Sequence, residues 1–464
     1  MDLKKLFTLI PEVKQPDEKK VGFNTKLKWT FIILVAFFAL ANIPLFGLTS
    51  NALARFENLA ILLGTQFGSI ISLGVSPIVM GSIILQLLVG SEIIHIDTNT
   101  TEGKKFFQGV QKLLVVFFII FQSLIYVLMR GLEAAPGYTG LVIFQLILGG
   151  FAIFYMNELS EKWGFGSGVS LFIGAGVSWR LFTQAFQFIN SQGQNCLANF
   201  GELPACPGEV FTVFESLINQ NTIEMFAALA TIVATGLIFL LVVWAQSLKV
   251  EIPLSYGRLK GYGVKWPLNF FYASVIPVIL VAALMANIQV IGGLIENWVG
   301  HATFLGGFDG SGQATSGLAF WVSASNLLEL GIRGGLLPKH ILQGLIHIIV
   351  FTFLATVFSV FWVKTSGMDS KNTAKKIQAQ GLQIAGFRQD TRILENILDR
   401  YIMPLTIMGG AAIGLLAATT DLLGALVSGT AMLLVIMVFY QFYQNIAKQH
   451  MTDMNPAMRK FMGS

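Results

Sequence analysis

Charged residues are scarce in this sequence. Asp, Glu, Lys and Arg make up only 12% of its 464 residues, whereas hydrophobic residues make up 54%. A soluble chain usually carries about 25% charged residues. The shortage excludes an ordinary soluble domain and predicts a protein that lies in a lipid bilayer.

The sequence motifs of catalysis and metal binding are also missing. The sequence contains no HExxH zinc-protease motif and no GxxxxGK[ST] phosphate-binding loop. Charges inside apolar segments usually mark ion-coupled transport, but Glu224 and Arg180 lie near segment ends. His347 is the only centrally placed His, and we interpret it as a hydrogen-bonding residue between helices. We therefore predict no enzyme, no ion-coupled pump, no catalytic residue, no metal and no cofactor.

Apolar segments recur along almost the whole chain. A membrane-spanning helix needs about 20 predominantly apolar residues. Ten segments meet or approach this length: 28–48, 74–92, 107–130, 138–157, 168–190, 222–248, 269–294, 339–364, 399–419 and 424–447. Residues 1–27 carry both charge signs and no cleavage site, so we expect no removable signal peptide. We predict an all-α polytopic membrane protein with ten transmembrane helices.

Lys and Arg are distributed unevenly between the connecting segments. With ten spans and a cytosolic N-terminus, all but five of the 30 fall on the cytosolic side. The five exceptions are Arg55, Arg130, Arg180, Arg333 and Lys339. Because basic residues favour the cytosolic side, we predict that residues 1–27 and the tail 448–464 are both cytoplasmic.

Ten spans divide into two halves of five, residues 28–190 and 222–447. Because five is an odd number, the second half must run inverted relative to the first, as in membrane proteins that open a path between two sides. The segments VSPIVMGSIILQLL (75–88) and VIPVILVAALMANI (275–288) share an early proline, Pro77 and Pro277. We predict two pseudo-symmetric inverted halves.

A short, soft segment precedes the second span. Residues 55–74 are apolar, but they include Arg55, Glu57 and Gln66 and three glycines at positions 64, 68 and 74. A simple membrane anchor has no use for such a segment. Nearby, Val75 and Val79 lie four residues apart on one helix face, as do Val169 and Ile173. These aliphatic pairs either line a path or pack against lipid and neighbouring helices.

Three loops stand out. Residues 191–221 form an external loop with no Lys or Arg, in which Cys196 and Cys206 are either a disulfide or two free thiols. The cytosolic loops 249–268 and 365–398 are basic. Their charge reflects either the orientation rule or docking onto phosphate-rich RNA or an acidic protein surface.

Four stretches, in order, resemble the SecY family, the central subunits of the protein-conducting translocation channel. They are SLGVSPIVMGSIILQLLVG, GFGSGVSLFIGAGVS, VEIPLSYGRLKG and, in the long loop, GFR. These four stretches are most similar to the archaeal branch of the family, and the resemblance covers roughly residues 20–450. The resemblance implies a channel through which secretory polypeptides cross the membrane and from which membrane-protein helices leave sideways into the lipid. It also implies that the pore lies between the two halves.

The resemblance also implies roles for particular residues. The family's pore ring falls on Val75, Val79, Val169, Ile173, Ile279 and Leu434. Its re-entrant plug helix falls on residues 55–67, with Arg55, Phe56, Glu57, Leu62, Gly64 and Gln66, and with Gly68 in the hinge that follows. Its lateral gate falls on Met80, Gln122 and Asn287, and because Met80 and Gln122 depart from the family's polar residues, we expect a gate held more by apolar contacts. Its ribosome-docking loops contain Lys249, Arg258, Lys260 and Arg388.

The partners that the resemblance implies are SecE (the gamma subunit), the beta subunit, the ribosome, signal sequences with their nascent chains, and the bilayer of the cell membrane. Two other interpretations compete with a channel. A secondary transporter with broken helices would need polar groups at the midplane, which the sequence lacks. A non-conducting membrane scaffold leaves the glycine-rich segment before the second span without a purpose.

Overall fold

The structure is a computed structural model that describes residues 11–17, 21–91, 93–94, 96, 100–189, 195–196, 206–256, 263–273, 276–379, 382–383 and 391–454. Ten helices of 15 residues or more account for most of it. They are α2 (Phe23–Ala41), α4 (Ser76–Gly90), α5 (Thr101–Leu128), α6 (Thr139–Trp163), α7 (Gly168–Phe186), α9 (Thr222–Gln246), α10 (Ile276–Val299), α13 (Pro338–Thr365), α15 (Thr391–Leu422) and α16 (Gly429–Met454). Each overlaps one of the ten predicted segments.

Length and composition make eight of these helices candidate membrane spans: α2, α5, α6, α9, α10, α13, α15 and α16. Helix α4 is apolar but has only 15 residues. The chain is therefore a multi-pass membrane protein, as its composition predicts.

Shorter elements connect the long helices. The helical ones are η1 (Ala52–Phe56), α3 (Glu57–Leu62), α8 (Glu209–Ile218), α11 (Gly317–Val322), α12 (Leu327–Ile332) and α14 (Ser370–Ala379). The strands are β1 (Leu48–Asn51), β2 (Leu132–Ala134), β3 (Lys249–Tyr256), β4 (Gly263–Asn269), β5 (Gly307–Phe308), β6 (Ala314–Ser316) and β7 (Leu382–Gln383). They form antiparallel pairs β1–β2 and β5–β6 and a sheet in the order β4–β3–β7.

Several predicted boundaries were wrong by six to eight residues, and two of them have a clear physical reason. The first segment was expected to run from 28 to 48, but α2 ends at Ala41, because Pro44 disfavours helical backbone in the residue before it. The seventh was expected to begin at 269, but α10 begins at Ile276. Asn269 is the last residue of β4 and pairs with Lys249, so the apolar chain there is used in a strand.

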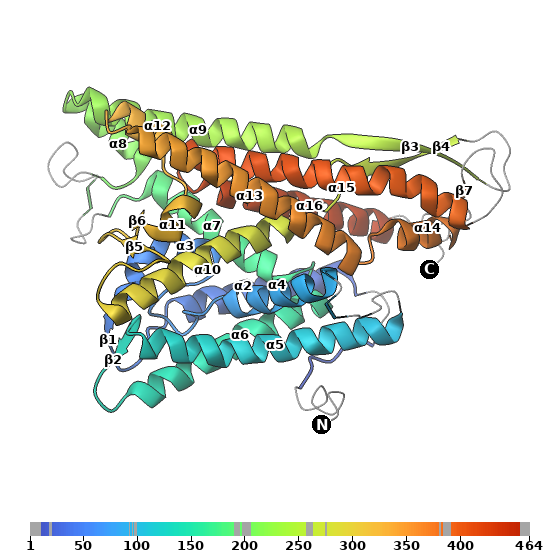
Figure 1. Cartoon of the computed structure of the whole chain (residues 1–464), viewed down its shortest axis with the longest axis horizontal. Helices are drawn as coiled ribbons and strands as arrows, with labels where there is room; N and C mark the ends of the chain where they lie inside the picture. The colour runs from blue at the N-terminus through green and yellow to red at the C-terminus, as the bar shows by residue number, and fades with distance from the viewer. Residues whose placement is uncertain are drawn as a thin grey trace.

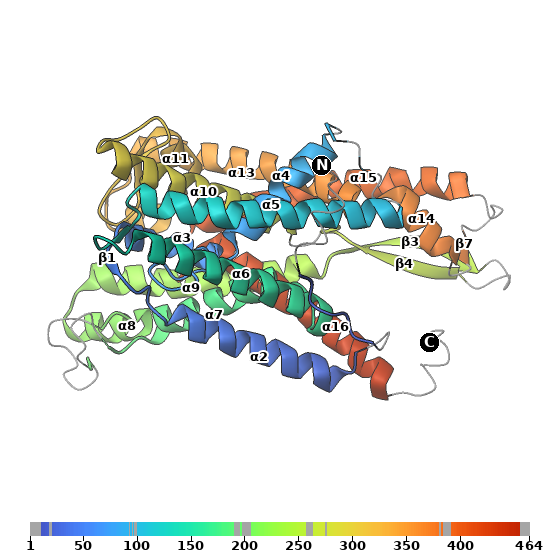
Figure 2. The same cartoon turned by 90° about the horizontal axis from the view of Figure 1, so that it is seen from below.

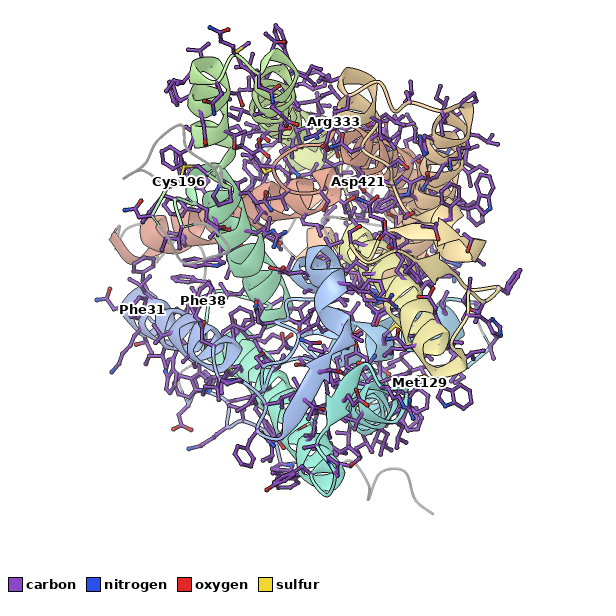
Figure 3. All side chains as sticks on the ribbon, turned by 90° about the vertical axis from the view of Figure 1, so that its left-hand side faces the viewer. Phe31, Phe38, Met129, Cys196, Arg333 and Asp421 are labelled. Atoms are coloured by element: carbon purple, nitrogen blue, oxygen red, sulfur yellow. A yellow bond between two sulfur atoms is a disulfide. The ribbon has the colours of Figure 1, made fainter. Side chains whose placement is uncertain are left out.

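The long helices lie side by side along the longest axis of the molecule (Figures 1 and 2). At one end lie β3, β4, β7 and α14, and we call it the sheet end. At the other end lie β1, β2, β5, β6, α8, α11 and α12, and we call it the disulfide end (Figure 1). Figure 3 views the molecule from the disulfide end and places Phe31 of α2 at its periphery, where the side chain is exposed. Such apolar outer faces suit contact with lipid.

The interior is one large hydrophobic cluster to which both halves contribute. Helix α4 lies within it and packs against α5, α10 and α13. Where α13 meets α15, Gly410 faces Ser359 and Gly414 faces Ala355, and such small residues let helices in membranes approach closely. A second, smaller cluster at the sheet end includes Leu268 and Leu398 and joins β4 to α15.

Candidate channel site

The six predicted ring residues come from four helices and lie in one hydrophobic cluster. Val75 is the N-cap residue of α4, and Val79 lies one turn further on. The others lie on α7, α10 and α16: Val169, Ile173, Ile279 and Leu434. All but Val169 are buried, and Val169 packs against the same cluster. The six aliphatic side chains therefore belong to, or pack against, one apolar cluster that both halves of the chain build.

The predicted plug folds back against this cluster. Residues 55–67 begin in η1, continue through α3 and end in the turn after it. The side chains of Phe56 and Leu63, and of Leu53 just before the plug, are almost fully buried. The Val75 backbone N–H donates a hydrogen bond of 2.8 Å to the Leu63 carbonyl. A Cβ on Gly64 would lie 3.4 Å from the Val75 side chain. The end of the plug therefore touches the ring directly.

The segment between α3 and α4 is not helical, yet its polar groups have partners inside the protein. The Thr65 hydroxyl donates to the Ile71 carbonyl over 2.7 Å, and the Gly68 N–H donates to the Ser72 hydroxyl over 2.9 Å. The Asn51 side chain donates to the Phe67 carbonyl over 3.0 Å. Irregular backbone at membrane depth requires such internal partners.

Glycine is required at the hinge positions of this segment. The φ angles of Gly64, Gly68 and Gly74 are +52°, +94° and +55°, a region that residues with a side chain rarely adopt. At Gly74 a Cβ would also lie 2.4 Å from the Leu63 carbonyl oxygen and 2.6 Å from the Thr65 Cβ. The three glycines therefore shape a tight turn between α3 and α4. Gln66 lies exposed between them.

A chain of hydrogen bonds joins three helices at the predicted gate. The Gln122 side chain on α5 donates to the Ser76 hydroxyl on α4 over 3.1 Å. That hydroxyl donates to the side-chain amide oxygen of Asn287 on α10 over 2.7 Å. All three side chains are buried. Met80 lies half-buried against the main cluster, outside this chain of hydrogen bonds.

Sequence reasoning missed Ser76, the residue that bridges Gln122 and Asn287. Its only signal was its position four residues before Met80, on the same face of the helix.

Sequence reasoning also missed Asp421. The carboxylate of Asp421 accepts hydrogen bonds from the backbone N–H (2.6 Å) and the hydroxyl of Thr430, and it lies 3.5 Å from His347. His347 also bonds to the Val322 carbonyl over 2.6 Å, which fits its interpretation as an interhelical residue.

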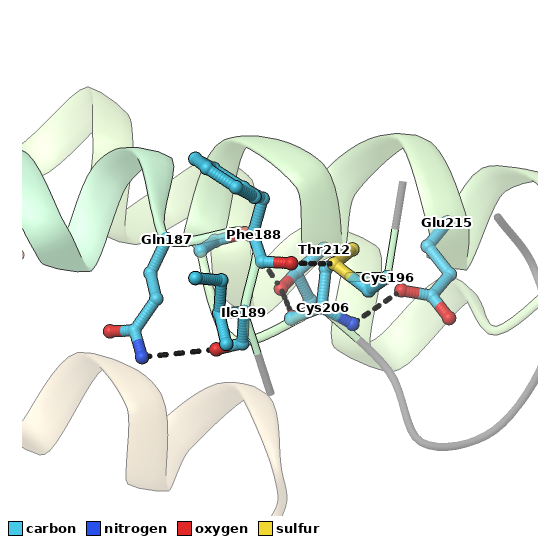
Figure 4. The surroundings of a disulfide bond; sticks show 8 residues. Gln187, Phe188, Ile189, Cys196, Cys206, Thr212 and Glu215 are labelled. Atoms are coloured by element: carbon cyan, nitrogen blue, oxygen red, sulfur yellow. Dashed lines mark hydrogen bonds between the residues drawn. A yellow bond between two sulfur atoms is a disulfide. The ribbon is translucent and has the colours of Figure 1, made fainter. Parts of the chain in front are cut away.

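The two cysteines form a disulfide at the disulfide end (Figure 4). The Cys196 N–H donates to the Phe188 carbonyl, and the Cys206 N–H donates to the buried Glu215 carboxylate. The Thr212 hydroxyl donates to the Cys206 carbonyl. These bonds attach the bridge to α8 and to the end of α7.

Of the predicted docking residues, only Lys249 lies among the residues that the structure describes, exposed at the start of β3. Arg258, Lys260 and Arg388 lie outside the described residues. Within the described part of the chain, no group of three or more His, Cys, Asp or Glu side chains is arranged to hold a metal ion.

The fold and site define a class: a multi-pass membrane protein in which both halves of the chain build one apolar interior, with a folded-back segment packed against it. The chain belongs to the SecY family, whose sequence profile matches residues 69–443. It is 41% identical to the protein translocase subunit SecY of Methanothermobacter thermautotrophicus, over 99% of this chain and 98% of that one. It is 36% identical to the SecY of Methanocaldococcus jannaschii, over 99% of this chain and all of that one.

Solved structures show the same similarity. One, described as the structure of a protein conducting channel, gives a TM-score of 0.82 at 34% identity and covers 98% of this chain and 99% of that one. Another, described as Sec61 in the canine ribosome-channel complex from the endoplasmic reticulum, gives 0.78 at 34% identity with the same coverage.

Proposed function

We propose that this protein is a protein-conducting channel, which passes secretory polypeptides across the membrane and releases membrane-protein helices sideways into lipid. The observation that carries the proposal is the contact of Leu63 and Gly64 with Val75. This contact places the folded-back segment before α4 directly against one of the aliphatic residues of the proposed ring. Its relatives are named protein translocase subunits, and one similar structure is described as a protein-conducting channel. In this proposal the chain acts as a passage and performs no catalysis of its own.

The ring residues Val75, Val79, Val169, Ile173, Ile279 and Leu434 form the constriction. A channel for any polypeptide cannot offer specific hydrogen bonds, because such bonds would retain some sequences and not others. Aliphatic side chains can close around a moving chain at little polar cost. A narrow apolar neck also loses water and so resists ion flow.

The segment 55–67 is the plug. It is apolar enough to fill the space beside Val75, and the turn at Gly64, Gly68 and Gly74 lets it move as a unit. In the resting channel it blocks the path, and a translocating chain displaces it towards the disulfide end, which we assign to the outside of the cell.

The lateral gate lies between α4 and α5 on one side and α10 and α13 on the other. The Gln122–Ser76–Asn287 hydrogen bonds cross this seam and hold it shut. A signal sequence or membrane helix of sufficient hydrophobicity replaces these contacts with its own and then leaves between the helices. Met80 lines the same seam.

The sheet end faces the cytosol, with both termini, and the protein resides in the cell membrane. The basic loops 249–268 and 365–398, with Lys249, Arg258, Lys260 and Arg388, receive the ribosome, which pushes the chain. A structure of a ribosome-channel complex among the similar proteins supports this partner. SecE and the beta subunit complete a heterotrimer.

Passage of a polypeptide through reconstituted vesicles tests the proposal. The purified heterotrimer in liposomes, supplied with ribosomes carrying a secretory precursor, should render the precursor resistant to external protease. A helix of marginal hydrophobicity in the same precursor should instead remain in the bilayer. A precursor that stays fully protease-sensitive would support the scaffold interpretation, and uptake of a small solute alone would support a transporter.

A further inference from the structure

One side chain of the plug reaches across to the other half of the molecule. Arg55 Nη2 lies 3.0 Å from Glu296 Oε2 on α10, in an ion pair whose side chains are only 18% and 16% exposed. The same nitrogen donates to the Asn297 side-chain oxygen over 3.2 Å and to the Gly293 carbonyl over 3.3 Å. The ion pair between Arg55 and Glu296 joins residues that are 241 positions apart in the sequence.

Aromatic rings and a turn complete the surroundings of Arg55. Its guanidinium carbon lies 4.9 Å from the Phe56 ring centre and 5.7 Å from that of Phe308. These two rings meet edge to face at 5.1 Å, and a cation over such rings is attracted by their electron density. Gly312 lies so close to the Arg55 carbonyl that no larger residue fits there.

Glu296 binds on two sides. One carboxylate oxygen pairs with Arg55, and the other accepts a hydrogen bond of 2.9 Å from the Phe308 backbone N–H at β5. The plug, α10 and the β5–β6 hairpin therefore meet at one carboxylate. We call this set, Arg55, Phe56, Glu296 and Phe308, the plug anchor.

The next charged residue of the plug makes an ion pair of a different kind. Glu57 lies 2.8 Å from Arg180 on α7, but the Glu57 side chain is 64% exposed. Arg180 belongs to the same half of the chain as the plug, so separation of the halves leaves that pair intact. An exposed ion pair contributes little to stability. Of the two charged plug residues, only Arg55 therefore bridges the halves.

We propose that the plug anchor is a positioning contact that ties the plug to the C-terminal half and must break when the channel opens. The inference rests on the proposed function, because it needs the segment 55–67 to be a movable plug. Charge-assisted hydrogen bonds are stronger than neutral ones, so loss of this pair should change the closed-to-open ratio by roughly tenfold. Weakening the plug anchor therefore favours the open channel.

Charge reversal and charge exchange test this proposal in the reconstituted heterotrimer without ribosomes. Arg55→Glu and Glu296→Arg should each raise ion leak through resting channels about tenfold, because each places like charges together. The double variant, which restores opposite charges, should bring the leak back towards that of the wild type. Glu296→Gln retains an acceptor for the Phe308 N–H and should raise the leak in the same direction by less, which guards against misfolding of Glu296→Arg.

Arg333→Glu is the control outside the plug. It reverses one charge of the exposed Arg333–Glu224 ion pair, which lies within the C-terminal half, and its leak should stay within about twofold of the wild type. The proposal is overturned if Arg55→Glu leaks no more than Arg333→Glu, or if the double variant leaks as much as the worse single variant. Precursor passage measured in the same vesicles separates this outcome from a failure of the channel function. If passage is normal and the charge exchange does not restore closure, only the plug anchor is refuted.

Discussion

Two contacts join the N-terminal half to α10, and they use opposite chemistry. The Gln122–Ser76–Asn287 contact is neutral and buried. The Arg55–Glu296 contact is charged, keeps some exposure and lies near the disulfide end. Burying a charge costs far more than burying an amide or a hydroxyl. The comparison teaches that, of these two contacts, the charged one lies where its side chains keep some contact with solvent, and the fully buried one is neutral.

The first prediction places a charge in the neutral contact. In the wild type the Asn287 side-chain N–H donates to the Ala283 carbonyl. Asn287→Asp replaces this donor with a carboxylate oxygen, which repels the Ala283 carbonyl oxygen. A buried, uncompensated charge costs roughly 3–5 kcal/mol, so we expect a marked fall in the thermal unfolding midpoint of the detergent-solubilised heterotrimer. An unchanged midpoint would show that the seam admits water and that the comparison fails.

The second prediction removes the bridge. Ser76→Ala leaves the Asn287 oxygen and the Gln122 amide without their shared hydroxyl, at a cost of about 1–3 kcal/mol. Because the closed seam loses this energy, marginally hydrophobic segments should insert into the membrane more readily. Insertion efficiency in a glycosylation or protease assay measures the shift, and a lower efficiency would contradict it. Ser82→Ala, which removes a hydroxyl on the same helix outside this contact, is the control.

The third prediction adds polarity beside the neutral contact. Met80→Thr introduces a hydroxyl one turn from Ser76 and should strengthen the closed seam by about 0.5–1.5 kcal/mol, the net value of one hydrogen bond. Segments of marginal hydrophobicity should then insert less readily. Insertion equal to that of the wild type would count against a gate role for Met80.

The smallest expected effect concerns the turn that covers the plug anchor. The Ser311 hydroxyl, followed by the backbone N–H groups of Gln313 and Ser311, lowers the pKa of the Asp309 carboxyl. A depressed folded-state pKa stabilises the turn above the unfolded value of about 3.9, and this stabilisation is lost as the pH falls through the folded value.

Asp309→Asn removes this contribution. Amide hydrogen exchange at Gln313 should therefore be faster in the variant than in the wild type at neutral pH. The difference should shrink as the pH drops below about 4. A difference that stays constant with pH would show that the charge of Asp309 plays no part in holding the turn.

The sequence predicts the helices well because each is a long apolar run that only a helix can place in lipid. It fails where apolar residues serve another structure. Residues 269–275 are apolar enough to extend α10, but Asn269 pairs in β4 instead. Likewise the apolar run of α2 continues past the proline at position 44, where the helix has already ended.

The sequence shows those parts of the candidate site that depend on the local choice of residues. It does not show the parts that depend on partners far away in the chain. Aliphatic spacing at Val75 and Val79 and the glycines that follow Leu63 are visible in the chain. The partners of Ser76 and Arg55 are not, because they lie 211 and 241 residues away. Nothing in the local sequence distinguishes Glu296 from an acidic residue at a helix end.

One measurement tests the central claim most directly. A cysteine placed at Ile279 should cross-link to a secretory chain stalled on the ribosome in mid-passage, because Ile279 belongs to the ring that we propose around the path. A cysteine at Leu237, 61% exposed on α9, is the control on the outer face and should not cross-link. Cross-linking at Leu237 with none at Ile279 would place the chain outside the aliphatic ring and contradict the account.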